Sequence, residues 1–79
     1  MAISYIEPDI LNANSNFVIV KFINDENNKE FARPINIPYD SNNAIDLVEW
    51  NTRLESHLRS VIYKHNIGLI EFVDPPFDL

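Results

Sequence analysis

Residues 44–66 read AIDLVEWNTRLESHLRSVIYKHN, and this stretch decides the fold. At about 100° per residue, its large apolar side chains fall on one narrow stripe, whereas charged and small polar side chains occupy the opposite side. The pattern therefore predicts one long amphipathic helix that buries a single face. The stripe consists of Leu47, Trp50, Leu54, Leu58, Val61 and His65, with Ile62 widening it.

Both ends of this helix carry terminal signals. The preceding loop contains Ser41 and Asn42, which are favoured N-cap residues because their side-chain oxygens accept hydrogen bonds from unpaired backbone N–H groups. Lys64 in the last turn complements the helix dipole. We expect Asn66 or Gly68 to end the helix, and Gly68 adopts the left-handed conformation most readily.

The residues before the helix predict a β-hairpin. Residues 17–23, FVIVKFI, are rich in β-branched and aromatic side chains on both faces, which is typical of a strand that is covered on both sides. Residues 24–28, NDENN, suit the turn because Asn and Asp tolerate positive φ. The return strand spans residues 29–37, and Pro34 within it lacks a backbone donor, so we expect this strand at a sheet edge.

A short final strand is predicted after the helix, at residues 69–73, LIEFV. The expected fold class is therefore α+β, with an antiparallel β-hairpin and a C-terminal strand on one long helix, in the order ββαβ. Residues 17–73 would form this single domain. An irregular N-terminal arm, residues 1–16, precedes it, and a Pro-rich tail, residues 74–79, follows it.

Composition narrows the range of functions. The 79 residues contain no cysteine, which excludes disulfides and thiolate metal sites, and so small a core favours oligomerisation. The net charge of −6 argues against a nucleic acid or an anionic membrane as partner. No apolar run reaches the roughly 18 residues that span a bilayer. The first residues lack the pattern of a secretory signal.

No catalytic or metal-binding motif is present. His57 and His65 are eight positions apart on one helix, too far for the i,i+4 pairing that holds zinc. The acidic cluster of Asp25, Glu26 and Glu30 lacks the spacing and the glycine of a calcium loop. A single glycine cannot form a phosphate-binding loop. We therefore expect neither enzyme activity nor a cofactor.

Surfaces that contact other proteins are the remaining candidates. Trp50 either packs in the core or anchors an interface, and Tyr63 is either simply exposed or a contact residue. The N-terminal arm and the tail either fold back or dock on a neighbouring subunit. The edge strand offers pairing by β-augmentation. The candidate interface residues are Ile6, Ile10, Leu11, Pro34, Trp50, Tyr63, Pro75, Pro76, Phe77 and Leu79.

The order of a hairpin, the loop IPYDSNN at residues 37–43, the helix and then GLIEF at residues 68–72 resembles small accessory proteins of tailed bacteriophages. This resemblance covers roughly residues 17–73. It implies a multimeric virion or assembly protein, such as a capsid-decorating, head–tail or tail component, found in the virion or the host cytoplasm. The alternative is a small acidic regulatory or inhibitory protein that binds a basic site on a partner.

Overall fold

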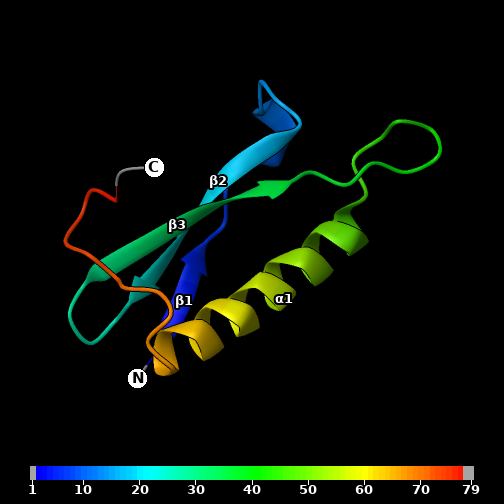
Figure 1. Cartoon of the computed structure of the whole chain (residues 1–79). Helices are drawn as coiled ribbons and strands as arrows, with labels where there is room; N and C mark the ends of the chain where they lie inside the picture. The colour runs from blue at the N-terminus through cyan, green and yellow to red at the C-terminus, as the bar shows by residue number, and fades with distance from the viewer. Residues whose placement is uncertain (1, 78–79) are drawn as a thin grey trace.

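Three strands and one helix make up the fold in the computed structural model, which describes residues 2–77 (Figure 1). The antiparallel sheet has the order β1-β2-β3, and the helix follows all three strands. The α+β class is confirmed, whereas the predicted ββαβ order is wrong. The elements are β1 (Ile3–Ile6), the 3-10 helix η1 (Ile10–Asn12), β2 (Phe17–Asn24), β3 (Lys29–Asn36) and α1 (Leu47–Asn66).

The third strand comes from the N-terminal segment and not from residues 69–73. β1 pairs with β2 from Ile3 opposite Asn24 to Ile6 opposite Lys21. Since the Asp25 N–H donates to the Ala2 carbonyl at 2.9 Å, alternate residues from Ala2 onward direct their backbone groups at β2. Pro8 occupies the next such position after Ile6 and has no N–H to donate. The strand therefore ends at Ile6.

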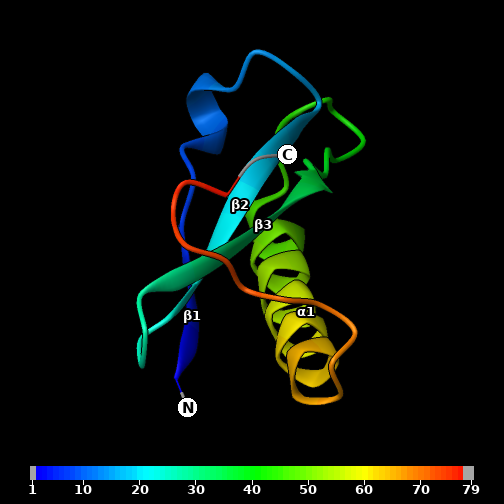
Figure 2. The ribbon, with the colours of Figure 1, turned by 60° about the vertical axis from the view of Figure 1, so that its left-hand side comes forward.

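Within residues 2–77, the C-terminal segment pairs with the backbone of the sheet at a single bridge. The Glu30 N–H donates to the Val73 carbonyl at 2.8 Å, and the Val73 N–H donates back to Glu30 at 2.9 Å. Prolines limit any longer ladder on either side, because Pro34 in β3 and Pro75 and Pro76 after the bridge cannot donate. The segment therefore leaves the end of α1 and crosses the beginning of β3 without forming a strand (Figure 2).

The hairpin of β2 and β3 agrees with its sequence signals. The register runs from Phe17 opposite Asn36 to Asn24 opposite Lys29. In the turn, the Glu26 N–H donates to the Asn24 side-chain oxygen at 3.0 Å, and Asn28 adopts a φ of 57°. Because Asn tolerates this left-handed conformation, the turn closes without a glycine.

α1 begins later than predicted. Its N-cap is Asp46, whose carboxylate accepts the Glu49 N–H at 3.0 Å, and neither Ser41 nor Asn42 caps it. The preceding residues instead form a separate loop, because the Asp40 carboxylate accepts the Asn42 N–H at 2.8 Å. At the other end, Gly68 has a φ of 79°, as its residue type predicts.

The core lies between α1 and one face of the sheet. Trp50, Leu54 and Val61 of the predicted stripe are buried, and they pack with Ile10, Val20, Phe22, Ile35, Ile37 and Phe72. Leu47 is the exception in the stripe, since its side chain is 54% exposed in the first turn. The interior is thus one apolar layer with the helix on a single side.

Candidate interaction surfaces

The sheet face turned away from α1 presents apolar side chains to solvent. Strand alternation places Phe17 and Ile19 on this side of β2, and the register adds Ile6 from β1 and Pro34 from β3. Ile6, Phe17 and Ile19 are 55%, 45% and 43% exposed, and Pro34 is also exposed. We call these four residues the outer face. The sequence predicts a strand covered on both sides, but α1 covers only one of them.

The outer face has no net charge. Lys21 lies between Ile19 and Ile23 on the same side of β2, and its Nζ is 3.7 Å from Oε1 of the buried Glu30. The opposite charges of Lys21 and Glu30 cancel. In a chain with a net charge of −6, the outer face is therefore a neutral apolar surface.

β2 has an open edge beside the outer face, because β1 spans only half of its length. Hydrogen-bond alternation directs the backbone N–H and carbonyl of Ile19 to the side where β1 has already ended. Within the described chain, residues 2–77, no backbone group pairs with Ile19 on that side. Such an edge can accept another extended segment.

β3 lies at a sheet edge, as Pro34 predicts, and part of this edge is occupied. The outward backbone groups of Glu30 pair with Val73. Pro34 has no N–H, and the Asn36 carbonyl accepts a hydrogen bond from Nη1 of Arg53 at 2.8 Å. Pro34 therefore contributes its ring to the outer face and little to strand pairing.

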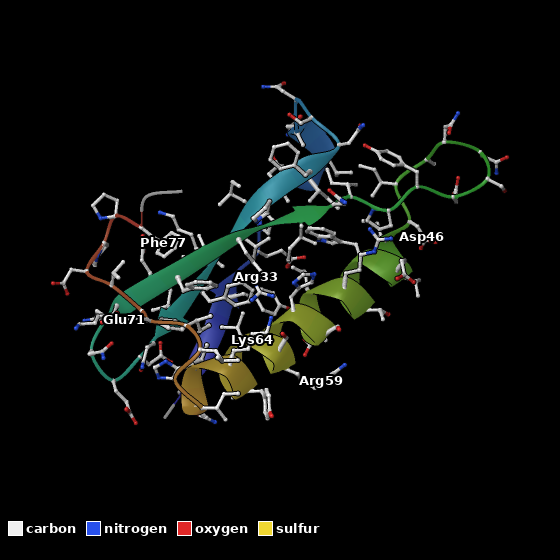
Figure 3. All side chains as sticks on the ribbon, in the orientation of Figure 1. Arg33, Asp46, Arg59, Lys64, Glu71 and Phe77 are labelled. Atoms are coloured by element: carbon white, nitrogen blue, oxygen red, sulfur yellow. The ribbon has the colours of Figure 1, made fainter. Side chains whose placement is uncertain are left out.

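The beginning of the tail folds back on β3. The Phe77 N–H donates to Glu30 Oε1 at 2.7 Å, and the Phe77 ring lies edge-on to Phe31 with centroids 5.1 Å apart. Figure 3 shows Phe77 beside β3. Pro75 and Pro76 are exposed in the loop that leads there. Leu79, the last predicted interface residue, lies outside the described residues.

The other predicted interface residues are distributed over the molecule. Ile10 and Trp50 are buried in the core, where the Trp50 Nε1 has no hydrogen-bond partner among residues 2–77. Leu11 on η1 and Tyr63 on α1 are exposed. Of the predicted residues within 2–77, the structure therefore places Ile6 and Pro34 on the outer face, and it adds Phe17 and Ile19.

A polar groove that the sequence did not predict runs between β3 and α1. It has a volume of about 510 Å³ and is lined by Pro34, Ile35, Asn36, Arg53 and His57. The sequence contains part of the information, because strand alternation turns position 33 of β3 toward α1 and helical spacing turns position 57 toward β3. Their meeting depends on how the strand and the helix dock, which no local pattern specifies.

Arg33 and His57 meet at the rim of this groove. Nη1 of Arg33 is 3.2 Å from Nδ1 of His57. Because a guanidinium only donates, Nδ1 accepts this bond, and the neutral imidazole carries its proton on Nε2. Burial lowers the pKa of His57, and the charges of Arg33, Arg53 and Lys64 lower it further. Burial also lowers the pKa of Arg33.

A second hollow adjoins the groove at Asn36. It has a volume of about 700 Å³ and is lined by Asn16, Asn36, Ile37, Tyr39 and Asn43. Its polar lining consists of side-chain amides and one phenol, so it offers hydrogen bonds without charge. The two hollows share Asn36 as a lining residue near the end of β3.

No family model, no curated protein and no solved structure matches this chain. Among residues 2–77, no three or more His, Cys, Asp or Glu side chains come together in a way that could hold a metal ion. In the same part of the chain, no helix is both long and apolar enough to cross a bilayer. The features that bear on function are therefore the outer face, the open edge of β2 and the groove between β3 and α1.

Proposed function

We propose that this chain is a non-catalytic protein–protein interaction module that associates with further copies of itself through the outer face. The observation that carries the proposal is the exposure of Ile6, Phe17 and Ile19 together on one side of the sheet. A strand rich in apolar residues on both faces is ordinarily covered on both faces. A second copy of the chain would cover the outer face, which α1 leaves exposed.

Charge favours a second copy as the occupant. Two chains with a net charge of −6 repel one another, so they approach most easily through a surface without net charge. The outer face meets this requirement because Lys21 and Glu30 balance. A two-fold arrangement also brings the same patch of each copy together, which an apolar self-complementary face allows.

The expected strength of one contact explains why such a module would work in a multimer. Covering a half-exposed large apolar side chain contributes about 1 kcal/mol, so three from each copy contribute about 6 kcal/mol. Association costs about 4–15 kcal/mol in lost freedom. A dimer would therefore be weak in isolation, and pairing along the open edge of β2 or a scaffold that holds many copies would strengthen it.

The setting we propose is a particle of a tailed bacteriophage, as a capsid-decorating, head–tail or tail component. The resemblance of residues 17–73 to small accessory proteins of these viruses supports this setting. Protein subunits are the proposed partners, and the net charge of −6 disfavours nucleic acid. Many identical contacts in a particle would compensate for the weakness of each one.

Sedimentation velocity over a wide concentration range tests the proposal. The wild-type protein should sediment faster as its concentration rises, whereas the double variant Phe17→Thr, Ile19→Thr should remain monomeric. Thr is β-branched and therefore suits a strand at both positions. The control is Val48→Thr, Leu69→Thr, which also removes two exposed apolar side chains but lies off the outer face. A wild-type monomer at every concentration, or equal loss of association in the control, would refute the proposal.

A further inference from the structure

The groove between β3 and α1 shares only Pro34 with the outer face and has a chemistry of its own. We propose that this groove binds an oxyanion, a carboxylate or phosphate group, through Arg53, His57 and the adjoining Arg33. The ligand would lie beside Asn36, which lines both the groove and the amide-lined hollow. This inference goes beyond the proposed self-association and does not depend on it.

Among residues 2–77, Arg33 is a half-buried cation without a counter-ion. No carboxylate of residues 2–77 lies within the 4.0 Å of an ion pair with it. Its neighbours are the neutral His57 and the ring of Phe31, whose centroid is 5.7 Å from the guanidinium carbon. Burial of an unpaired charge is unfavourable and is usually compensated by a partner ion. An anion in the adjoining groove would compensate it here.

Positive charge is concentrated at this place although the chain is acidic. Besides burial, three of the six Lys and Arg side chains, Arg33, Arg53 and Lys64, lower the pKa of His57. Figure 3 shows Arg33 on β3 and Lys64 on α1 on the same side of the molecule, whereas Arg59 extends from the far side of the helix. The local field in the groove therefore attracts anions, against the sign of the whole chain.

Donors remain available in the groove after the internal contacts are made. Arg33 uses one N–H for His57. Arg53 uses its Nε for Glu49 at 3.6 Å and one Nη1 hydrogen for Asn36. Each guanidinium has five N–H donors in a planar fork, so both retain several, and this geometry matches the oxygens of carboxylate or phosphate. The neutral His57 adds the N–H on Nε2.

His57 reports occupancy of the groove. The cations that face it are Arg33 from β3 and Arg53 and Lys64 from α1, and an anion between them offsets their repulsion. The His57 ring then takes up a proton more readily, so anion binding should raise its pKa. The ring resonances of His57 in an NMR pH titration measure this change directly.

The test uses two probes with the full chain, inorganic phosphate and the acidic peptide acetyl-Glu-Ala-Glu-Ala-Glu-amide. We expect at least one probe to shift the His57 resonances saturably and to raise its pKa. Arg53→Gln and Arg33→Gln should each weaken the binding by about tenfold or more, because each removes charge-assisted hydrogen bonds. Arg59→Gln carries the same change in charge at an exposed position outside the groove and should weaken it much less.

The outcomes separate the ligand sources and leave the proposal open to refutation. Peptide binding at least tenfold tighter than phosphate binding would assign the groove to carboxylates of a protein partner, and the reverse would assign it to a phosphate group. Absence of a saturable His57 shift with both probes would overturn the inference. Equal weakening by Arg59→Gln and Arg53→Gln would also overturn it, because it would show attraction to overall charge alone. Arg53 lies at the surface, so its variant remains informative if Arg33→Gln fails to fold.

Discussion

Replacing Leu54 by Ala tests whether the helix stripe is the core of this protein. Leu54 is fully buried at 0% exposure beneath the sheet, so the substitution removes three carbons and leaves a cavity. Comparable substitutions cost about 2.7–5 kcal/mol. At about 0.05–0.15 kcal/mol per residue, a chain of 79 residues has a total stability of about 4–12 kcal/mol. We therefore expect the variant to lose at least about a quarter of its stability and, at the low end of that range, to unfold.

Leu47→Ala is the matched control, since it makes the same chemical change on the same helix at a side chain that is 54% exposed. Urea unfolding followed by circular dichroism, at one protein concentration, measures both variants. With a slope of about 1 kcal/mol per molar urea, Leu54→Ala should lower the midpoint by about 3 M and Leu47→Ala by less than about 1 M. Leu54→Val is a milder substitution for the case in which the Ala variant is unfolded. Equal losses at positions 47 and 54 would refute the assignment of the core.

Three further predictions follow from buried or paired groups. Trp50 is almost completely buried, so its fluorescence should resist quenching by acrylamide until urea unfolds the chain. Glu30→Gln weakens the bond to the Phe77 N–H, so amide exchange at Val73 should accelerate by about tenfold in deuterium-exchange experiments, without a change at Trp50. Folding lowers the pKa of His57, so the unfolded state binds a proton more readily than the folded state does. The contribution of neutral His57 to stability is therefore complete above about pH 6.5 and is lost as the pH falls below that value. The urea midpoint should therefore fall from pH 7 to pH 5, and His57→Gln should reduce that fall.

The helix and the hairpin are predictable because their signals are local. Apolar residues at helical spacing specify the face of α1 that meets the sheet, and residues 24–28 contain the turn formers that join β2 to β3. Even so, the start of α1 is displaced. Asp40 organises its own loop through the Asn42 N–H, which leaves Asp46 to cap the helix. Several residues before the helix are of types that favour N-caps, and composition alone does not show which of them caps it.

The third strand is not predictable from composition, because residues 3–6 and 69–73 both have the residue types of a short strand. Which of them pairs with the hairpin depends on the neighbours available in space. β2 accepts residues 3–6 along four consecutive pairs, whereas β3 offers Pro34 within the stretch that a C-terminal strand would need. The final segment therefore keeps only the bridge between Glu30 and Val73. The choice of pairing partner is a tertiary property, which the residue types of a short segment do not specify.

The two proposed surfaces lie on different sides of the sheet, and this separation makes a further prediction possible. The groove lies between β3 and α1, whereas Phe17 and Ile19 point away from α1. Substitutions at sites without shared contacts are usually additive. The variant Phe17→Thr, Ile19→Thr should therefore bind the anion probes with the affinity of the wild type, and Arg53→Gln should sediment like the wild type. Reciprocal loss, in which each variant impairs both measurements, would contradict two independent surfaces and would mean that self-association itself forms the anion site, with Pro34 as the residue common to both surfaces.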